Sequence, residues 1–528
     1  MTGIVIVLAV VLIIGRSYNL FTRFEDESQS SATTEVGSET NDEREAREAE
    51  EAAQKENERI EQERIEREKA EEAARIAKDI QENSWYIKSD DTPIFSVAEA
   101  KSEAEIGFLQ GKTKVYVSKY LVSEAQDTLK NENENSEDSK IEDENAISWV
   151  ELKSSYDALS PLGYVPYEAL VKSRAEFMSH PYEDADYEAF EKNAKFAQNP
   201  PETVKGIYVT GPSISTAKIE SLIELLDTTE LNTMVIDVKD DNGRLLFYSK
   251  TASEINPEAN DRVYISDMPA LIEKLKEHNI YLIARIVTFK SPIYARNNPD
   301  QAIGYLGTNK LYSDADGLIW ASAYNQELWA YNVGIAKEAA TLGFNEIQFD
   351  YVRFPAISNK SAIDFKNTSG ASQASTIQSF LKYAYRELNP MNVYVSADVF
   401  GWAATAINDV GIGQHWEAVS NVVDYICPMV YPSHYGPYNY GIPVPDADPY
   451  KTIDATIKDA QDRNANLETP AIIRPWIQDF TATWVEGHIR YSVEEVKAQI
   501  DALRDNGIED FMLWNARNNY TVGALQTE

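Results

Sequence analysis

The sequence predicts an α/β protein whose main domain, residues 204–528, is a (β/α)8 TIM barrel. Eight strand-like runs occur there, at residues 205–210, 234–238, 281–289, 346–352, 393–399, 425–431, 471–476 and 511–515. Helical patterns alternate with most of them, at residues 216–227, 267–278, 326–342, 373–388, 451–464 and 493–505. A doubly wound sheet is the alternative. It is disfavoured because residues 209–213, Val-Thr-Gly-Pro-Ser, do not form the Gly-rich phosphate loop of such folds.

Before the barrel, residues 1–24 are predicted to be an uncleaved signal anchor. Ile4 to Ile14 is an apolar run, and the span extends from Gly3 to Phe21 if Arg16 snorkels to the interface. No small-residue cleavage site follows the run. We therefore expect a single-pass protein of the bacterial cell membrane with the bulk of the chain outside, although the basic residues give no clear orientation.

Residues 25–84 are predicted to be an acidic linker followed by a charged helical stalk over residues 43–82. Glu residues precede Arg or Lys at i,i+4 spacing, and no Gly or Pro interrupts the stretch. Its isoleucines are too few for sustained heptads, so a solvated stalk is favoured over a coiled coil. At ~1.5 Å per residue, such a helix would be about 60 Å long.

Residues 85–172 are predicted to be a small β domain, with an acidic insertion at residues 124–146. Short aromatic and β-branched runs occur at residues 85–87, 113–117, 148–152 and 163–166, each bounded by turn residues. Their order resembles a bacterial SH3-like module, which implies attachment to the cell wall. A spacer without a ligand is the alternative. Residues 173–203 are expected to form a linker helix.

The net charge of −37 argues against nucleic acid as a partner, because an acidic chain repels phosphate backbones. About half of this charge lies in residues 25–84 (net −12) and 124–144 (net −7). The single cysteine, Cys427, excludes disulfides and cysteine clusters, and the five histidines form no metal-binding pattern. We expect no metal and no cofactor, and we interpret Asp240-Asp241-Asn242-Gly243 as a polar turn.

Strand parity selects the candidate catalytic residues. Apolar Ile347 and Phe349 should face the helices, which turns Asp350 into the barrel, and the same alternation turns Asp398 inward on the next strand. Two carboxyl groups at the outgoing ends of neighbouring strands are what glycoside cleavage needs. Each aspartate taken alone could instead be a helix cap or an arginine counter-ion, with Arg353 as the competing partner of Asp350.

Further polar and aromatic residues are predicted to bind substrate at the same end of the barrel. Flat aromatic rings stack on sugars, and inward charges bind hydroxyl groups or tune the carboxyl groups. The candidates are Tyr208, Asp237, Lys239, Arg285, Arg353, Trp402, Tyr431, His434, Arg474, Trp476, Gln478 and Trp514.

Six segments of the barrel resemble one family. They are Lys205–Thr210, Asp237–Asp240, Phe349–Pro355, Ser396–Gly401, Cys427–Tyr435 and Arg474–Phe480, and with their order they look like the glycoside hydrolase domain DUF4015 over about residues 204–524. The resemblance implies a TIM-barrel hydrolase related to the α-amylase-like glycosidases. In that pattern the fourth-strand Asp, here Asp350, is the nucleophile. The fifth-strand acid/base is usually Glu, where this chain has Asp398.

The sequence thus predicts a cell-surface glycoside hydrolase that cleaves a polysaccharide with two carboxyl groups, by a retaining mechanism. The rival hypothesis is a non-catalytic glycan-binding or wall-scaffold protein on the same barrel. A phosphate-handling barrel enzyme is disfavoured, because no Gly-rich loops follow the last two strands.

Overall fold

The computed structural model describes residues 41–89, 91–122, 147–193 and 195–526, and the chain divides into two units, Met1–Glu82 and Asn83–Glu528. The predicted anchor, residues 1–24, and the acidic insertion lie outside the described residues. Within the described part, no helix is both long enough and apolar enough to cross a membrane.

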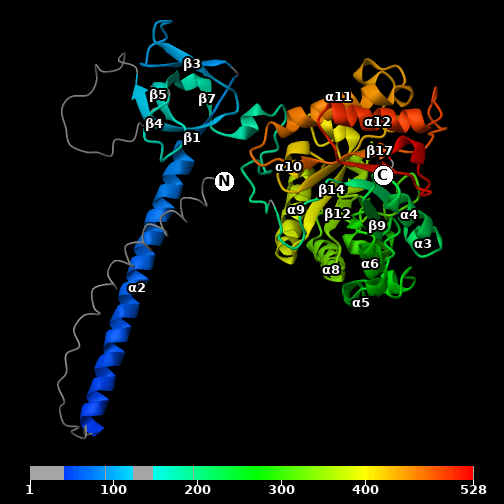
Figure 1. The fold of residues 1–528 in the computed structure, drawn as a ribbon, viewed down its shortest axis with the longest axis horizontal. Helices are drawn as coiled ribbons and strands as arrows, with labels where there is room; N and C mark the ends of the chain where they lie inside the picture. The colour runs from blue at the N-terminus through cyan, green and yellow to red at the C-terminus, as the bar shows by residue number, and fades with distance from the viewer. Residues whose placement is uncertain (1–40, 90, 123–146, 194, 527–528) are drawn as a thin grey trace. The chain divides into compact units, whose positions relative to one another are not determined.

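The predicted charged helix is confirmed as α2 (Asn41–Asn83) (Figure 1). Arg59 pairs with Glu56 and Glu63, and Arg64 pairs in the same way with Glu61 and Glu68. All six side chains are at least half exposed, so these pairs support the helix only weakly. Whether α2 also pairs as a coiled coil stays a prediction.

The segment after α2 forms a seven-stranded antiparallel sheet. Its strands are β1 (Ser84–Ile87), β2 (Thr92–Phe95), β3 (Glu105–Leu109), β4 (Lys114–Val122), β5 (Ile147–Lys153), β6 (Gly163–Pro166) and β7 (Leu170–Val171), in the order β3-β2-β6-β5-β4-β1-β7. Its core consists of aliphatic residues such as Val117, Val150 and Val165. A small β domain is therefore present here, and its SH3-like nature and wall attachment stay predictions.

The expected linker helix at residues 173–203 is wrong. Only a 3-10 turn, Arg174–Phe177, forms, and the rest of the described segment is irregular. Pro181, Pro200 and Pro201 oppose a helix, and barrel side chains bind the backbone N–H groups that a helix would have used. Gln378 accepts from the N–H of Asp186 at 2.7 Å, and Thr469 accepts from that of Phe190 at 3.0 Å.

The predicted TIM barrel is confirmed (Figure 1). Its parallel strands are β8 (Lys205–Val209), β9 (Thr233–Lys239), β10 (Tyr281–Val287), β12 (Glu346–Asp350), β14 (Tyr394–Phe400), β15 (Tyr425–Met429), β17 (Trp476–Gln478) and β18 (Phe511–Trp514). Pairing of β18 with β8 closes the barrel, and the short β16 (Ile472–Ile473) lies beside β15 just before β17.

Helices surround this sheet and cover its outer face. They are α3 (Gly211–Ile214), α4 (Lys218–Asp227), α5 (Lys250–Ile255), α6 (Met268–Glu277), α7 (Pro292–Asn297), α8 (Gln326–Leu342), α9 (Gln373–Leu388), α10 (Trp416–Ser420), α11 (Pro449–Asn464) and α12 (Val493–Asp505). The six predicted helices correspond to α4, α6, α8, α9, α11 and α12. A small two-stranded antiparallel sheet of β11 (Gly304–Tyr305) and β13 (Ile363–Asp364) lies in the loops.

Two separate apolar clusters confirm the parity on which the site prediction depends. Ile347 and Phe349 belong to the large cluster between sheet and helices, whereas Val235 and Cys427 belong to the cluster inside the barrel.

The N-terminal end of the barrel is closed by the segment before β8. The side chain of Asn199 in this segment donates to the backbone oxygen of Asn345, directly before β12, and to that of Asn392, just before β14. The open end is therefore the C-terminal one.

Candidate active site

A cleft of about 490 Å³ opens at the C-terminal end of the barrel. Its lining comes from the outgoing ends of the strands and the loops that follow them. The lining residues are Tyr208, Asp241, Arg285, Asp350, Tyr351, Arg353, Phe400, Gly401, Trp402, Met429, Tyr431, His434, Tyr435, Trp514 and Ala516. This is where active sites of TIM barrels lie.

Asp350 is the last residue of β12 and is held by three N–H groups. Arg285, on β10, donates Nε at 3.0 Å and Nη2 at 2.5 Å to the same carboxylate oxygen, and the amide of Tyr351 donates to the other at 2.5 Å. Tyr351 has a φ of 47°, a conformation that costs a bulky residue energy and is typical of functional sites. The carboxylate of Asp350 is thus fixed in position at the cleft, and its charge is compensated by Arg285 rather than Arg353.

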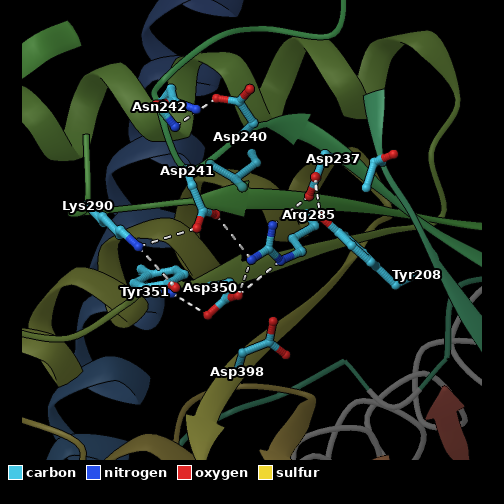
Figure 2. Close-up of polar contacts among 12 residues, drawn as sticks. Tyr208, Asp237, Asp240, Asp241, Asn242, Arg285, Lys290, Asp350, Tyr351 and Asp398 are labelled. Atoms are coloured by element: carbon cyan, nitrogen blue, oxygen red, sulfur yellow. Dashed lines mark hydrogen bonds and ion pairs between the residues drawn. The ribbon is translucent and has the colours of Figure 1, made fainter. Parts of the chain in front are cut away.

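Asp398 lies on β14, the strand beside β12. Phe349 pairs with Ala397, so continuing this register by one residue places Asp350 and Asp398 at the same level. Figure 2 shows Asp398 below Asp350, with no bond drawn between Asp398 and Arg285. Its side chain is 1% exposed and accepts the indole N–H of Trp476 at 2.8 Å. It therefore lies just beneath the cleft lining.

The two carboxyl groups differ in their surroundings. Burial raises the pKa of Asp398 well above its usual value, and the nearby negative charge of Asp350 raises it further. No cation binds Asp398 among the described residues, whereas Arg285 binds Asp350 directly. The two carboxyl groups thus differ: Arg285 binds that of Asp350, whereas that of Asp398 is buried without a cation in the described part of the chain and has a raised pKa.

Asp237, on β9, supports Arg285 from the other side. It accepts Nη1 of Arg285 at 2.5 Å and the hydroxyl of Tyr208 at 2.5 Å (Figure 2). Burial raises its pKa to about 6, against the opposing effects of Arg285 and the Tyr208 hydroxyl. Asp237 lies behind the cleft and orients Arg285 and Tyr208, which line it.

Aromatic rings form the walls of the cleft. Trp514 stacks on Tyr208, with ring centroids 4.0 Å apart and an interplanar angle of 17°. Trp402 is 39% exposed, and its ring lies edge-on to Tyr435. Gly401 has no room for a side chain, because a Cβ there would meet the Tyr435 hydroxyl and the Met429 carbonyl.

The hydroxyl of Tyr431 is a polar group without a partner. Its oxygen is buried and has no hydrogen bond within the described part of the chain. Burial raises the pKa of Tyr431 well above its usual value, and the charges of Asp398 and Asp350 add to this. Beside it lies the ring of His434, whose pKa is lowered by burial. Tyr431 and His434 thus both line the cleft, and the Tyr431 hydroxyl has no hydrogen-bond partner among the described residues.

Five predicted binding residues lie outside the cleft lining: Asp237, Lys239, Arg474, Trp476 and Gln478. Lys239 follows a bulge in β9, where the register against β10 shifts by one residue. Its ammonium group turns to the backbone oxygen of Val287 at 2.8 Å and to Asn332 on α8 at 2.8 Å. The bulge breaks the alternation that predicted an inward lysine, so the prediction is wrong for Lys239.

Arg474 and Gln478 have structural partners instead. Arg474 is fully buried and pairs with Glu346 at 2.7 Å and Asp510 at 2.9 Å, at the incoming ends of strands. Gln478 donates to Asp446 at 3.0 Å and accepts from the N–H of Ser433 at 3.1 Å, so it braces the loop next to His434. The structure places neither in the lining, and both predictions as substrate-binding residues are corrected accordingly. Trp476 also lies below the lining and contacts the site through Asp398.

Asp241 and Tyr351 are cleft residues that the sequence prediction missed. Asp240 accepts the N–H groups of Asn242 and Arg244, both at 2.9 Å, as expected of a polar turn. This turn places Asp241 at the cleft, where it pairs with Lys290 at 3.4 Å. An Asp pair directly after a strand was the available signal for Asp241. Tyr351 could have been found as the neighbour of Asp350.

Comparison with solved structures gives matches of low structural similarity. A hypothetical protein from Ruminiclostridium thermocellum is 33% identical (TM-score 0.33), and the alignment covers 37% of this chain and 97% of that one. The glycoside hydrolase domain of PgaB (BpsB) from Bordetella bronchiseptica is 11% identical (TM-score 0.44; 60% and 94% covered). The spore cortex-lytic enzyme SleL from Bacillus cereus is 12% identical (TM-score 0.35; 61% and 72% covered). No curated protein matches this sequence.

A protein family matches the barrel itself. Residues 206–520 match DUF4015, described as "Putative glycosyl hydrolase domain". This range covers more than half of the chain and every residue of the cleft. The chain therefore belongs to the DUF4015 family of glycosyl hydrolase domains.

Proposed function

We propose that the barrel hydrolyses a glycosidic bond within a polysaccharide, with Asp350 as the nucleophile and Asp398 as the acid/base. The observation that carries this proposal is the unequal pair: a carboxylate held by Arg285 at the cleft, and beside it a buried carboxyl group whose pKa is raised. Two carboxyl groups in such different environments are typical of the nucleophile and the acid of a glycosidase.

The proposed reaction has two steps. In the first, a carboxylate oxygen of Asp350 attacks the anomeric carbon while the bond to the leaving oxygen breaks, and Asp398 gives its proton to that oxygen. This leaves a glycosyl ester on Asp350 and a charged Asp398. In the second step, Asp398 takes a proton from water, the water oxygen attacks the anomeric carbon, and Asp350 is released as a carboxylate.

The strand register supports a retaining outcome. Asp350 and Asp398 extend from matching levels of neighbouring strands, and such strands lie about 4.8 Å apart. Retaining enzymes have carboxyl groups ~5–5.5 Å apart, whereas inverting enzymes leave room for a water between them at ~6.5–9.5 Å. Neighbouring positions on paired strands favour the shorter separation.

Aromatic side chains support a chain-like substrate. From Tyr431 a row of rings leads outward: Phe480 lies edge-on at 6.0 Å, and Trp484 stacks on Phe480 at 6.0 Å with an interplanar angle of 20°. Trp484 is 68% exposed. A flat exposed ring that is connected to the cleft residue Tyr431 through Phe480 suits a further sugar unit of a polymer. The predicted anchor and wall attachment would place this activity at the cell surface.

A non-catalytic glycan-binding barrel is the second candidate, favoured by the 1% exposure of Asp398. Screening the full chain against a panel of polysaccharides, with release of reducing ends as the readout, separates the two. The enzyme hypothesis predicts that the wild type releases reducing ends and that the double variant Asp350→Asn/Asp398→Asn releases none. Binding of a glycan with no release by the wild type would support the second candidate.

A further inference from the structure

Arg353 lies in the loop after β12, and its guanidinium group lines the cleft. It is 9% exposed. Three aromatic rings surround it: its guanidinium carbon lies 4.8 Å from the ring centre of Trp320, 5.0 Å from that of Tyr351 and 4.5 Å from that of Phe400. The rings hold the group in one place, so little conformational freedom remains to be lost when a ligand binds.

The positive charge of Arg353 has no carboxylate partner among the described residues. Its Nη1 donates to the backbone oxygen of Phe354 at 2.9 Å, and no Asp or Glu oxygen lies within ion-pair distance. The two other buried barrel arginines differ. Arg285 pairs with Asp237 and Asp350, and Arg474 pairs with Glu346 and Asp510.

The pKa values of the three buried arginines differ accordingly. Burial lowers the pKa of Arg353, although Tyr351 and the carboxylates of Asp350, Asp314 and Asp241 act in the opposite direction from beyond ion-pair distance. Burial also acts against the charge of Arg285 and Arg474, but neighbouring carboxylates raise their pKa well above the usual value. An unpaired charge in a buried site is costly, and proteins normally pair it. Arg353 lines the cleft, so a ligand bound there could supply the missing partner.

Resting on the proposed glycosidase function, we propose that the substrate carries a singly charged oxyanion on a sugar ring, and that Arg353 binds it. A carboxylate or a sulfate ester has this chemistry, and the planar guanidinium matches either through two parallel N–H bonds. Arg353 carries one positive charge, so a singly charged group is enough to pair with it. The other cations of the cleft are already occupied, Arg285 by Asp237 and Asp350, and Lys290 by Asp241.

Binding can be measured without turnover in the full chain carrying Asp398→Asn, because an amide imitates the protonated carboxyl group without adding charge. The probes are polyglucuronate, polygalacturonate and polymannuronate, each beside its carboxyl-reduced neutral counterpart, and sulfated beside unsulfated glucan. We expect at least one anionic polymer to bind roughly 10- to 100-fold more tightly than its neutral counterpart. The carboxylate and sulfate arms identify the source of the anion.

Arg353→Gln, added to this protein, should abolish the preference, and Arg353→Lys should retain part of it. Arg517→Gln is the matched control, since it removes an exposed positive charge near the same end of the barrel and should leave the preference intact. Thermal melts verify that each variant is folded. Equal binding of charged and neutral polymers, binding of no anionic polymer, or an equal loss for both in Arg353→Gln would overturn the proposal. An Arg353-dependent preference without cleavage by the wild type would instead contradict only the glycosidase function.

Discussion

The indole N–H of Trp476 donates a hydrogen bond to the carboxyl group of Asp398 at 2.8 Å. The two residues extend from β17 and β14, on either side of β15, so the bond spans the interior of the barrel. Burial and the charge of Asp350 both raise the pKa of Asp398, while this hydrogen bond lowers it. Trp476 is therefore a positioning residue that limits how strongly the proposed acid holds its proton.

Trp476→Phe should move the alkaline limb of the pH profile of kcat/KM to higher pH. Without the indole donor the pKa of Asp398 rises further, and the proton needed by the leaving group stays bound at higher pH. The measurement is the pH dependence of kcat/KM for wild type and variant. A lower rate with an unmoved alkaline limb would mean that Trp476 acts only through packing.

Arg285→Gln should lower the free energy of unfolding by about 3–5 kcal/mol, because it leaves Asp237 and Asp350 buried without their cation. Denaturant titration measures this. Arg285→Lys keeps the charge but not the planar fork and should cost less. In the double variant Asp237→Asn/Arg285→Gln the two effects should not add, because one carboxylate no longer needs a partner. Full additivity would show that the two residues act independently.

Trp484→Ala should raise KM for a long polysaccharide by roughly 3- to 10-fold, as expected from the loss of one stacking contact. KM for a substrate too short to reach Trp484, and kcat for both, should stay unchanged. Tyr248→Ala removes another well-exposed aromatic ring and is the matched control. An equal rise in KM for short and long substrates would place Trp484 outside any extended binding track.

His415 should make stability depend on acid pH. Its ring packs against Tyr182 and Tyr187, and burial lowers its pKa from 6.5 to about 4. Between these values the unfolded chain binds the proton more readily, so stability is lost as pH falls from 6.5 towards 4. At pH 4.5 this loss is about 2.5 kcal/mol.

His415→Gln is the comparison, since glutamine does not titrate. Unfolding free energies at pH 7 and pH 4.5 should differ more in the wild type than in this variant, by about the amount given above. Equal differences in both proteins would show that His415 titrates normally in the fold.

The sequence predicted the barrel well because strand and helix periods differ and alternate over more than 300 residues. Parity alone then placed Arg285, Asp350 and Asp398 inside. It failed at Lys239, because a bulge is invisible in a hydrophobic pattern. Parity also could not predict whether an inward residue lies near the open or the closed end of the barrel. Arg474 points inward as predicted, but towards the closed end.

Other features depend on contacts between distant segments. The irregular course of residues 173–203 follows from side chains such as Gln378 and Thr469 that bind its backbone, and no local pattern announces them. The pairing of Asp350 with Arg285 rather than Arg353 likewise needs the geometry of two strands. Because Asp350 pairs with Arg285, Arg353 has no carboxylate partner among the described residues.

The different tasks of Asp350 and Asp398 are tested most directly by kcat/KM, which reports the first chemical step, on two substrates with the same sugar, one with a dinitrophenyl leaving group and one with a sugar leaving group. The activated phenol needs no proton to depart. Asp398→Asn should therefore lose roughly 10²- to 10⁴-fold on the natural linkage but far less in the first step on the dinitrophenyl glycoside. Asp350→Asn should be inactive on both. Equal losses for both substrates in Asp398→Asn, or substantial activity in Asp350→Asn, would contradict the assignment.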